Sequence, residues 1–481
     1  MAHRTILTER QRSDLFDLPT DEATILQHYI LSDEDLEIIR TRRRARNQFG
    51  FALQLCALRY PGRLLAPGET IPEPLTMFLA AQLGLNPDDL ADYAHRAETR
   101  RTHLIELRSV FGYKMFSGRG ACDLRAWLEQ AAETVGSNKE LAQVFIEQCR
   151  RNQTILPGVS VVERLCADAL VAAERRIEAR IADRLTDVER NRLDGLLTEL
   201  VGGTVSRFVW LRQFEVGSNS AGAARLIDRL EFLQGLGLCP ELLGDIPPHR
   251  VTRLRRQGER YFADGLRDIS SDRRLAILTV CVVEWHAAIS DALVETHDRI
   301  VGKTWREAKK ICDARIADAK LILHDTLKSF KNLGAALLEA KEDQASLDVA
   351  TETACGWSHL AGLVATAAKL TDTMSADPLA HVVQGYHRFR RYVPRMLRAL
   401  DIHAVAVAEP LMAAAAVIAR DPKNAYRSNN FLRRGSKWHR QFNAQDKNDY
   451  RLWEVAVLFH LRDAFRSGDI WLAHSRRYAD L

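Results

Sequence analysis

The chain has 481 residues, a net charge of +5 and 27% charged residues. A single hydrophobic core stops growing at roughly 250–300 residues, so this length predicts several domains. The 46% share of hydrophobic residues excludes a disordered chain, and the low counts of glycine (26) and proline (14) favour helices.

The cysteines and the apolar runs predict a cytoplasmic protein without a membrane partner. None of the eight cysteines forms a CxxC pair, and most lie in apolar helical stretches, which is typical of buried free thiols. Residues 1–5 lack the apolar run of a signal peptide. The longest apolar run, 405–419, is interrupted by Glu409 and Pro410 and is too short to cross a bilayer.

Capping residues predict a series of helices in the first third of the chain. Ser32 begins one helix, and the apolar run 49–58 forms the next. A further helix ends at Gly84, and Asn86 is predicted to begin the one that follows. The spacing of small, turn and apolar residues makes 73–108 a candidate helix-turn-helix, with a tight corner between two helices as the alternative.

The rest of the chain continues the helical pattern. Two candidate boundaries carry prolines, at 156–158 and at 246–248. A long amphipathic helix is predicted over 161–184, an apolar one over 273–300, and amphipathic character continues over 309–340. Neither a β-hairpin signal nor a repeat of fixed period is present. The predicted fold class is therefore all-α with several domains.

Positive charge is concentrated in five groups of residues. Two lie before and within the candidate helix-turn-helix: Arg40, Arg42, Arg43, Arg44 and Arg46, then Arg96, Arg100, Arg101 and Arg108. The third comprises Arg253, Arg255, Arg256 and Arg260. The last two lie among aromatic residues: Arg388, Arg390, Arg391, Arg395 and Arg398, then Arg433, Arg434, Lys437 and Arg440. Between 388 and 440, twelve Lys and Arg stand against three Asp and Glu.

Clustered arginines neutralise phosphates and make bidentate contacts to guanine, so we expect at least one group to contact DNA. Because positions four apart on a helix share a face, Arg96, Arg100 and Arg108 are predicted to lie in one broad stripe. The alternative for each group is a solvated face, or pairing with nearby carboxylates.

Catalytic motifs are missing from the sequence. It contains no phosphate-binding glycine loop, no nucleophile elbow and no zinc-protease motif. Glu284, Asp291 and Asp298 recur at spacings of seven on a predicted helix, where a solvated face is favoured over a metal site. The histidines, such as His286, have no partner at ligand spacing. We therefore expect no catalytic residue, metal, cofactor or small-molecule substrate in this chain.

Four stretches resemble the Tn3-family transposases and keep the family order. They are 42–63 (RRRARNQFGFALQLCALRYPGR), 156–158 with 162–165, 273–276 with 290–292, and 461–471 with 475–478. The resemblance extends over essentially the whole chain. It implies tandem helical domains that recognise terminal inverted repeats, followed by a helical dimerisation and scaffold region. In the family an RNase-H-like domain with an Asp-Asp-Glu triad follows the last matching segment, so Mg²⁺ would belong to that domain.

The resemblance implies a division into four parts: a first DNA-binding domain (1–155), a second (156–265), a long-helix dimerisation region (266–375) and a basic helical scaffold (376–481). The expected partner is the double-stranded DNA of transposon ends, bound by a homodimer. The expected contacts are Arg40, Arg42, Arg43, Arg44, Arg46, Arg96, Arg100, Arg101, Arg108, Arg253, Arg255 and Arg256. Strand cleavage would then need a separate C-terminal chain. The alternative is a helical scaffold or regulatory protein with no specific DNA role.

Overall fold

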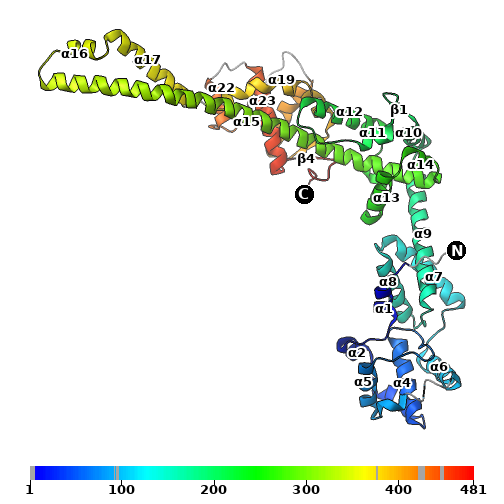
Figure 1. The fold of residues 1–481 in the computed structure, drawn as a ribbon. Helices are drawn as coiled ribbons and strands as arrows, with labels where there is room; N and C mark the ends of the chain where they lie inside the picture. Colours follow the sequence, from blue (N-terminus) through cyan, green and yellow to red (C-terminus); the bar gives the residue numbers. More distant parts are fainter. Residues whose placement is uncertain are drawn as a thin grey trace. The chain divides into compact units, whose positions relative to one another are not determined.

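The computed structural model describes residues 6–90, 93, 97–374, 377–420, 428–444 and 449–480. In this part of the chain the fold is all-α apart from two small antiparallel sheets, which confirms the predicted fold class (Figure 1). Two compact units are present. The first comprises Met1–Leu185, Leu243–Gln257 and Ile269–Ile277, and the second comprises Thr186–Leu242, Gly258–Asp268 and Leu278–Leu481.

Short, well-capped helices make up most of the first unit. Thr8 and Ser32 each form a capping box, as the acidic residues after Ser32 suggest. In chain order the elements are α1 (Glu9–Phe16), α2 (Glu22–His28), α3 (Asp33–Arg40), α4 (Ala45–Arg59), α5 (Glu73–Leu83), η1 (Pro87–Leu90), α6 (Ala97–Phe111), α7 (Gly118–Thr134), α8 (Asn138–Arg151) and α9 (Val159–Asp183). Helices α13 (Pro248–Arg260) and α15 (Ser271–Glu342) begin within this unit and end in the second.

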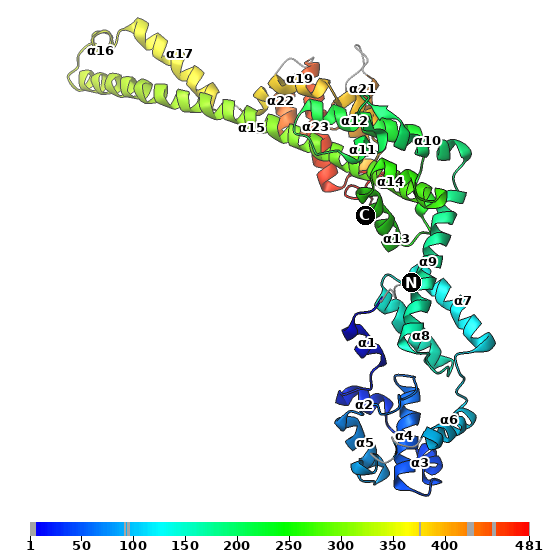
Figure 2. The ribbon, with the colours of Figure 1, turned by 45° about the vertical axis from the view of Figure 1, so that its right-hand side comes forward.

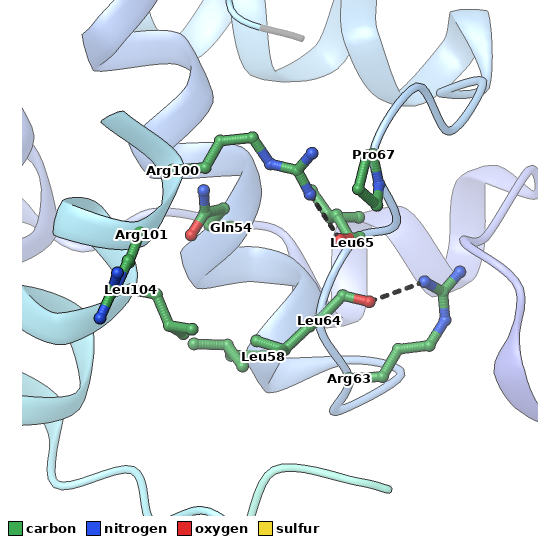
Figure 3. Close-up of a pocket in the computed structure, with 9 residues that line it drawn as sticks. All are labelled: Gln54, Leu58, Arg63, Leu64, Leu65, Pro67, Arg100, Arg101 and Leu104. Carbon is green, nitrogen blue, oxygen red and sulfur yellow. Dashed lines mark hydrogen bonds between the residues drawn. The ribbon is translucent and has the colours of Figure 1, made fainter. Parts of the chain in front are cut away.

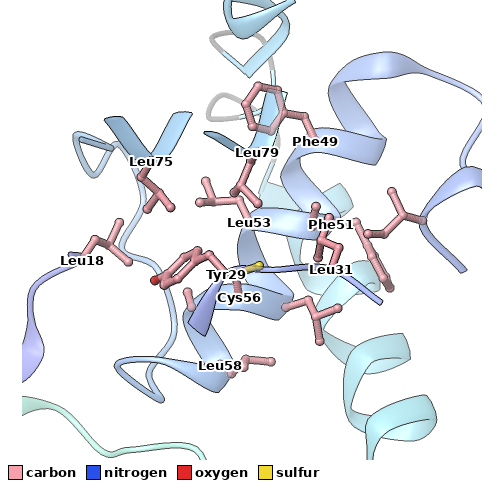
Figure 4. Packing of buried hydrophobic residues seen from close by; sticks show 14 of the residues in the cluster. Leu18, Tyr29, Leu31, Phe49, Phe51, Leu53, Cys56, Leu58, Leu75 and Leu79 are labelled. Atoms are coloured by element: carbon pink, nitrogen blue, oxygen red, sulfur yellow. The ribbon is translucent and has the colours of Figure 1, made fainter. Parts of the chain in front are cut away.

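Helix α4 forms the centre of one hydrophobic core. Every residue from Phe49 to Leu58 is buried, and α4 contacts α3, α5, η1 and α6. Figure 4 shows Leu53 and Cys56 of this helix packed among other buried side chains of the cluster. Leu53 and Leu79 are at most 2% exposed. Tyr29 is fully buried in the same core, and its hydroxyl donates a hydrogen bond to the Tyr60 carbonyl. Each large apolar side chain buried in this way contributes roughly 1.5–3 kcal/mol. The core therefore holds α4 rigidly at the centre of its neighbours.

A second core in the same unit joins α7, α8 and α9, and it includes Phe145 and Val162. The N-terminal segment is attached to this core through Glu163, which is buried on α9. Its carboxylate accepts the Leu7 backbone N–H at 3.2 Å and a bidentate pair from Arg12 at 2.8–3.1 Å. One buried acid thus fixes residues far away in the sequence.

The second unit is larger and also helical. Its elements are α10 (Asp187–Thr198), β1 (Leu200–Val201), β2 (Val205–Ser206), α11 (Arg207–Arg212), α12 (Ser220–Leu236), η2 (Pro240–Leu243), α14 (Ala263–Arg267), α15 (Ser271–Glu342), α16 (Leu347–Ala354), α17 (Trp357–Met374), α18 (Leu379–Val382), η3 (Val383–Gly385), α19 (Tyr386–Arg390), α20 (Val393–Ala399), β3 (Ile402–Ala404), η4 (Ala406–Ala408), α21 (Glu409–Arg420), α22 (Lys437–Ala444), α23 (Tyr450–Ser467) and β4 (Ile470–Leu472). Strand β1 pairs with β2, and β3 pairs with β4 so that Ile402 lies opposite Leu472.

Helix α15 runs without a break for 72 residues, where the sequence indicated two helical stretches. At 1.5 Å per residue this corresponds to about 108 Å. Its most apolar window is 67% buried, which is the pattern of a core helix. In that core His297 lies 2.9 Å from the Tyr392 hydroxyl and 3.3 Å from the Leu458 carbonyl, joining α15 to α23. In both Figure 1 and Figure 2, α16 and α17 turn back beside the distal half of α15.

Candidate nucleic-acid interface

The position of α6 is set by an aromatic side chain inserted against α4. Gly50 of α4 leaves room for the ring of Tyr93, because a Cβ at Gly50 would lie 2.3 Å from that ring. The Tyr93 hydroxyl accepts a hydrogen bond from the Gln54 amide and lies 3.1 Å from Nδ1 of His103 on α6. These contacts hold Tyr93 in the α4 core and join it to α6.

His103 and Arg42 complete the junction between α4 and α6. The His103 ring meets the edge of Phe51 at 5.3 Å, and burial together with the charge of Arg42 lowers its pKa to about 4. The Arg42 guanidinium lies 4.2 Å from the Phe51 ring centroid and forms an ion pair with Glu106 of α6 at 2.5 Å. Only 13% of the Arg42 side chain is exposed, so it holds the two helices together.

The outer face of α6 carries two exposed arginines around an exposed isoleucine. Arg101, Ile105 and Arg108 are spaced four and three residues apart and share one face. Ile105 is 57% exposed, and neither arginine has an ion-pair partner among the described residues. Of the predicted stripe, Arg108 lies on this face and Arg100 points elsewhere, while Arg96 lies outside the described residues.

Arg100 is turned toward the loop 63–69, as Figure 3 shows. It donates to the Leu65 carbonyl at 2.6 Å, and on the same loop Arg63 pairs with Glu69 at 2.5 Å and donates to the Phe16 carbonyl. The hollow of about 240 Å³ between them is lined by Gln54, Leu58, Arg63, Leu64, Leu65, Pro67, Arg100, Arg101 and Leu104. Arg63 and Arg100 therefore stabilise the loop 63–69, while Arg101 remains exposed.

The residues of the first arginine group also differ in exposure and in their partners. Arg40 at the end of α3, and Arg43 and Arg44 before α4, are exposed, with no ion-pair partner in the described part of the chain. Arg44 is the N-cap residue of α4 and makes no side-chain capping bond, while its carbonyl accepts the N–H groups of Asn47 and Gln48. Arg46 is half-buried and has an interaction within the protein.

The single helix predicted from Asn86 to Phe111 is wrong, because η1 (Pro87–Leu90) follows Asn86 and Tyr93 lies in a turn before α6. Helix α5 does end at Gly84, which is left-handed with φ 67°. The Asn86 side chain, however, accepts the Asp88 N–H at 3.0 Å and forms the turn of η1, and α6 begins only at Ala97. The connection is therefore longer than the three or four residues of a tight helix-turn-helix.

The third arginine group lies on α13, and one of its arginines pairs with a glutamate of α9. Arg253 pairs with Glu174 at 2.5 Å, and the neighbouring Arg250 is buried against the same carboxylate. Arg255 is half-buried with an interaction of its own, whereas Arg256 is exposed and has no ion-pair partner among the described residues. Arg260, at the end of α13, is exposed in the same way, so two arginines of this group are available to a ligand.

The evenly spaced carboxylates of α15 bind cationic or polar groups near the end of the chain. Asp298 pairs with Arg462 at 2.7 Å and with Arg466 at 2.8 Å. Asp291 accepts the Ser475 hydroxyl at 2.5 Å, and burial raises its pKa, while Glu284 pairs with Arg476. Within the described ranges, no three His, Cys, Asp or Glu side chains are grouped so that they could hold a metal ion. Sequence reasoning missed this anchoring role, because the partners lie far along the chain.

Comparison with known proteins identifies relatives over the whole chain. A family model described as a domain of unknown function, DUF4158, matches residues 6–169. The chain is 32% identical to the transposase for transposon Tn3926 of Escherichia coli and 31% identical to that for Tn21 of the same organism. It is also 32% identical to the transposase for transposon Tn501 of Pseudomonas aeruginosa. Each alignment covers 100% of this chain and 49% of the relative, so the chain spans about half the length of these relatives. The resemblance to Tn3-family transposases is thereby confirmed.

Proposed function

We propose that this chain, homologous over its full length to about half of a Tn3-family transposase, binds the double-stranded DNA of transposon ends during transposition. The observation that carries the proposal is a set of exposed side chains at the end of α3, directly before α4 and on α6, which we infer share one face. We call it the end-binding face and define it by Arg40, Arg43, Arg44, Arg101, Ile105 and Arg108.

The end-binding face has the chemistry that duplex recognition needs. The major groove admits one α-helix, and α6 presents two arginines that match guanine edges and one isoleucine that suits a thymine methyl. Arg43 and Arg44 stand directly before α4, where their exposed cationic side chains suit a phosphate. We infer that α6 reads bases and that the start of α4 holds the DNA backbone.

Arg42 and Arg100 have a different role in this proposal. Their guanidinium groups contact Glu106, Phe51 and the Leu65 carbonyl, so they position α6 and the loop beside it. Arg256 supplies a further phosphate contact from α13, and Arg253 and Arg255 support it. Arg46, half-buried on the first turn of α4, belongs to the positioning set.

Strand cleavage is not part of the proposed role of this stretch. The α15 carboxylates face arginines and a serine, which compensate their charge and leave a poor site for Mg²⁺. The chemistry of transposition would come from the part of a transposase that follows the segment 461–478 in the family.

We further propose that the chain dimerises through the distal part of α15 with α16 and α17. Aliphatic and aromatic side chains are more than half exposed there: Leu321, Ile322, Leu327, Leu338, Val349, Trp357 and Val364. Apolar surface of this extent marks a protein interaction site. A second copy is the natural occupant, because a transposon has two ends and a two-fold dimer offers one end-binding face to each.

Fluorescence anisotropy tests the DNA-binding proposal. The full chain is titrated with its own element's terminal inverted repeat and with a scrambled duplex, over a series of salt concentrations. We expect a clear preference for the repeat and steep weakening with salt. Arg101→Gln with Arg108→Gln should remove roughly 1–3 kcal/mol of preference per lost guanine contact, while Arg43→Gln with Arg44→Gln should weaken both duplexes equally.

Arg176→Gln is the matched control for lost charge, because Arg176 pairs with Glu129 and Glu133 within the first unit. It should leave both affinities unchanged. Equal, weak binding of the unaltered chain to both duplexes would contradict the proposal and favour a scaffold without a specific DNA role.

A further inference from the structure

A second group of exposed arginines lies in the other unit, around α22. Arg433 and Arg434 precede α22, and Arg440 lies on it; all three are exposed, with no ion-pair partner in the described ranges. We call these three residues the α22 basic surface. Arg391, at the end of α19, is also exposed, and α19 and α22 lie close to α23 in both ribbon views (Figures 1 and 2).

The α22 basic surface stands on a rigid aromatic base. Phe431 meets the ring of Trp453 on α23 at 6.1 Å, and Trp438 meets Phe459 at 5.4 Å. The Trp453 indole N–H donates to the Ser428 carbonyl at 3.1 Å, which fixes the loop that carries Arg433 and Arg434. Interleaved rings of this kind hold the backbone in place, so the arginine side chains extend from a fixed support.

Neighbouring arginines of the same basic stretch are used inside the protein. Arg388 pairs with Glu307 at 2.5 Å, and Arg395 pairs with both Asp228 and Glu231 at 2.6–2.8 Å. Arg398 donates to the Ala419 carbonyl at 2.9 Å. Against this background the α22 residues stand out, because the fold provides acceptors for Arg388, Arg395 and Arg398 and leaves these three cations exposed.

We propose that the α22 basic surface binds the phosphate backbone of duplex DNA, as a second contact distinct from the end-binding face. The inference rests on the proposed function, since the DNA is the duplex that the first unit recognises. Closely spaced guanidinium groups on a fixed support match adjacent phosphates, and such contacts position a duplex without reading its sequence.

The composition of the surface favours DNA over an anionic membrane. Membrane-surface segments place large apolar side chains beside their cations. Among the described residues from 428 to 442, none of the exposed side chains is a large hydrophobic one, because Phe431 and Trp438 are half-buried and Leu432 is buried. The ligand that fits is therefore a polyanion with regularly spaced phosphates.

The test compares the full chain with the triple variant Arg433→Gln, Arg434→Gln, Arg440→Gln on the terminal-repeat duplex. Each lost phosphate contact reduces the slope of log affinity against log salt by about 0.9. If the three arginines make three phosphate contacts, raising the salt from 50 to 200 mM should lower the DNA affinity of the unaltered chain about 40-fold more than that of the variant. Hydroxyl-radical footprinting should show protection lost on one short stretch of the duplex, with the preference for the repeat over a scrambled duplex retained.

Arg395→Gln is the matched control in the same unit and should leave the slope and the footprint unchanged. If the unaltered chain binds the repeat and the triple variant keeps the same slope and footprint, the inference is wrong while the end-binding proposal stands. If the unaltered chain binds neither duplex, both the inference and the end-binding proposal fail.

Equal loss of slope in the triple variant and in Arg395→Gln would also overturn the inference, because the effect would then come from net charge alone. Binding to vesicles of anionic phospholipid that the triple variant loses, without any change on DNA, would assign the surface to a membrane instead.

Discussion

Replacing Arg42 tests whether this arginine stabilises the fold, in contrast to neighbouring arginines that are proposed to bind DNA. Arg42→Gln removes the stacking on Phe51 at 4.2 Å and the ion pair with Glu106 at 2.5 Å. A cation–π contact of this kind contributes roughly 1 kcal/mol, and a pair with a partly exposed glutamate contributes about 0–1 kcal/mol. We therefore expect the variant to lose about 1–2 kcal/mol from the α4–α6 junction.

Amide hydrogen exchange is the suitable assay, because the chain has two units and its unfolding is not a single transition. A loss of about 1–2 kcal/mol predicts roughly 5- to 30-fold faster exchange in α4 and α6, with no change in the second unit. Arg43→Gln should leave exchange unaltered and weaken DNA binding. Unchanged exchange in Arg42→Gln, together with a loss of DNA affinity and salt slope equal to that of Arg43→Gln, would refute the positioning role of Arg42.

Three further changes test the packing of the first unit. Gly50→Ala adds a methyl group 2.3 Å from the Tyr93 ring and should cost about 1–3 kcal/mol, lowering the first unit's thermal midpoint; Gly120→Ala in the same unit, with open space around it, should not. The pKa of His103 in the fold, about 4, lies below its unfolded value of 6.5, so the neutral ring stabilises the fold fully above pH 6.5 and progressively less as the pH falls towards 4. At pH 5 the loss is about 2 kcal/mol, visible as faster exchange in α6, and a His103→Gln variant that kept the same pH dependence would contradict this assignment. Glu163→Gln should weaken the hold on residues 6–16 by about 2 kcal/mol, seen as faster exchange there, and equal protection in the variant would show that the buried carboxylate is dispensable.

The sequence was a good guide to helices and a poor guide to what each arginine does. The apolar run at Phe49–Leu58 predicts a buried helix, and Gly84 predicts a helix end, because both signals are local. The helix predicted from Asn86 continues only as the single turn η1, because Asn86 is as suitable for a turn as for a long helix, and Tyr93 lies in a turn before α6.

Adjacent arginines are the clearest case of information that the sequence does not carry. Arg42 and Arg43 look alike in composition and spacing, yet one is 13% exposed against Phe51 and Glu106 and the other points into solvent. Their difference depends on a glutamate more than sixty positions away. Asp298 on α15 likewise finds its arginine partners in α23, so its even spacing with neighbouring acids says nothing about its use.

The two kinds of arginine leave different traces in a binding experiment. An arginine that contacts a phosphate releases a counterion when DNA binds, so its loss changes both the affinity and the salt slope. Arg42 and Arg100 contact protein groups, so their loss tilts α6 or loosens its loop and weakens affinity while the number of phosphates neutralised stays the same. A plot of affinity loss against slope change should therefore separate Arg43, Arg44 and the α22 basic surface from the positioning residues. Arg100→Gln falling on the line of the phosphate-contacting variants would show that its bond to Leu65 breaks when DNA binds and that the guanidinium turns to the duplex.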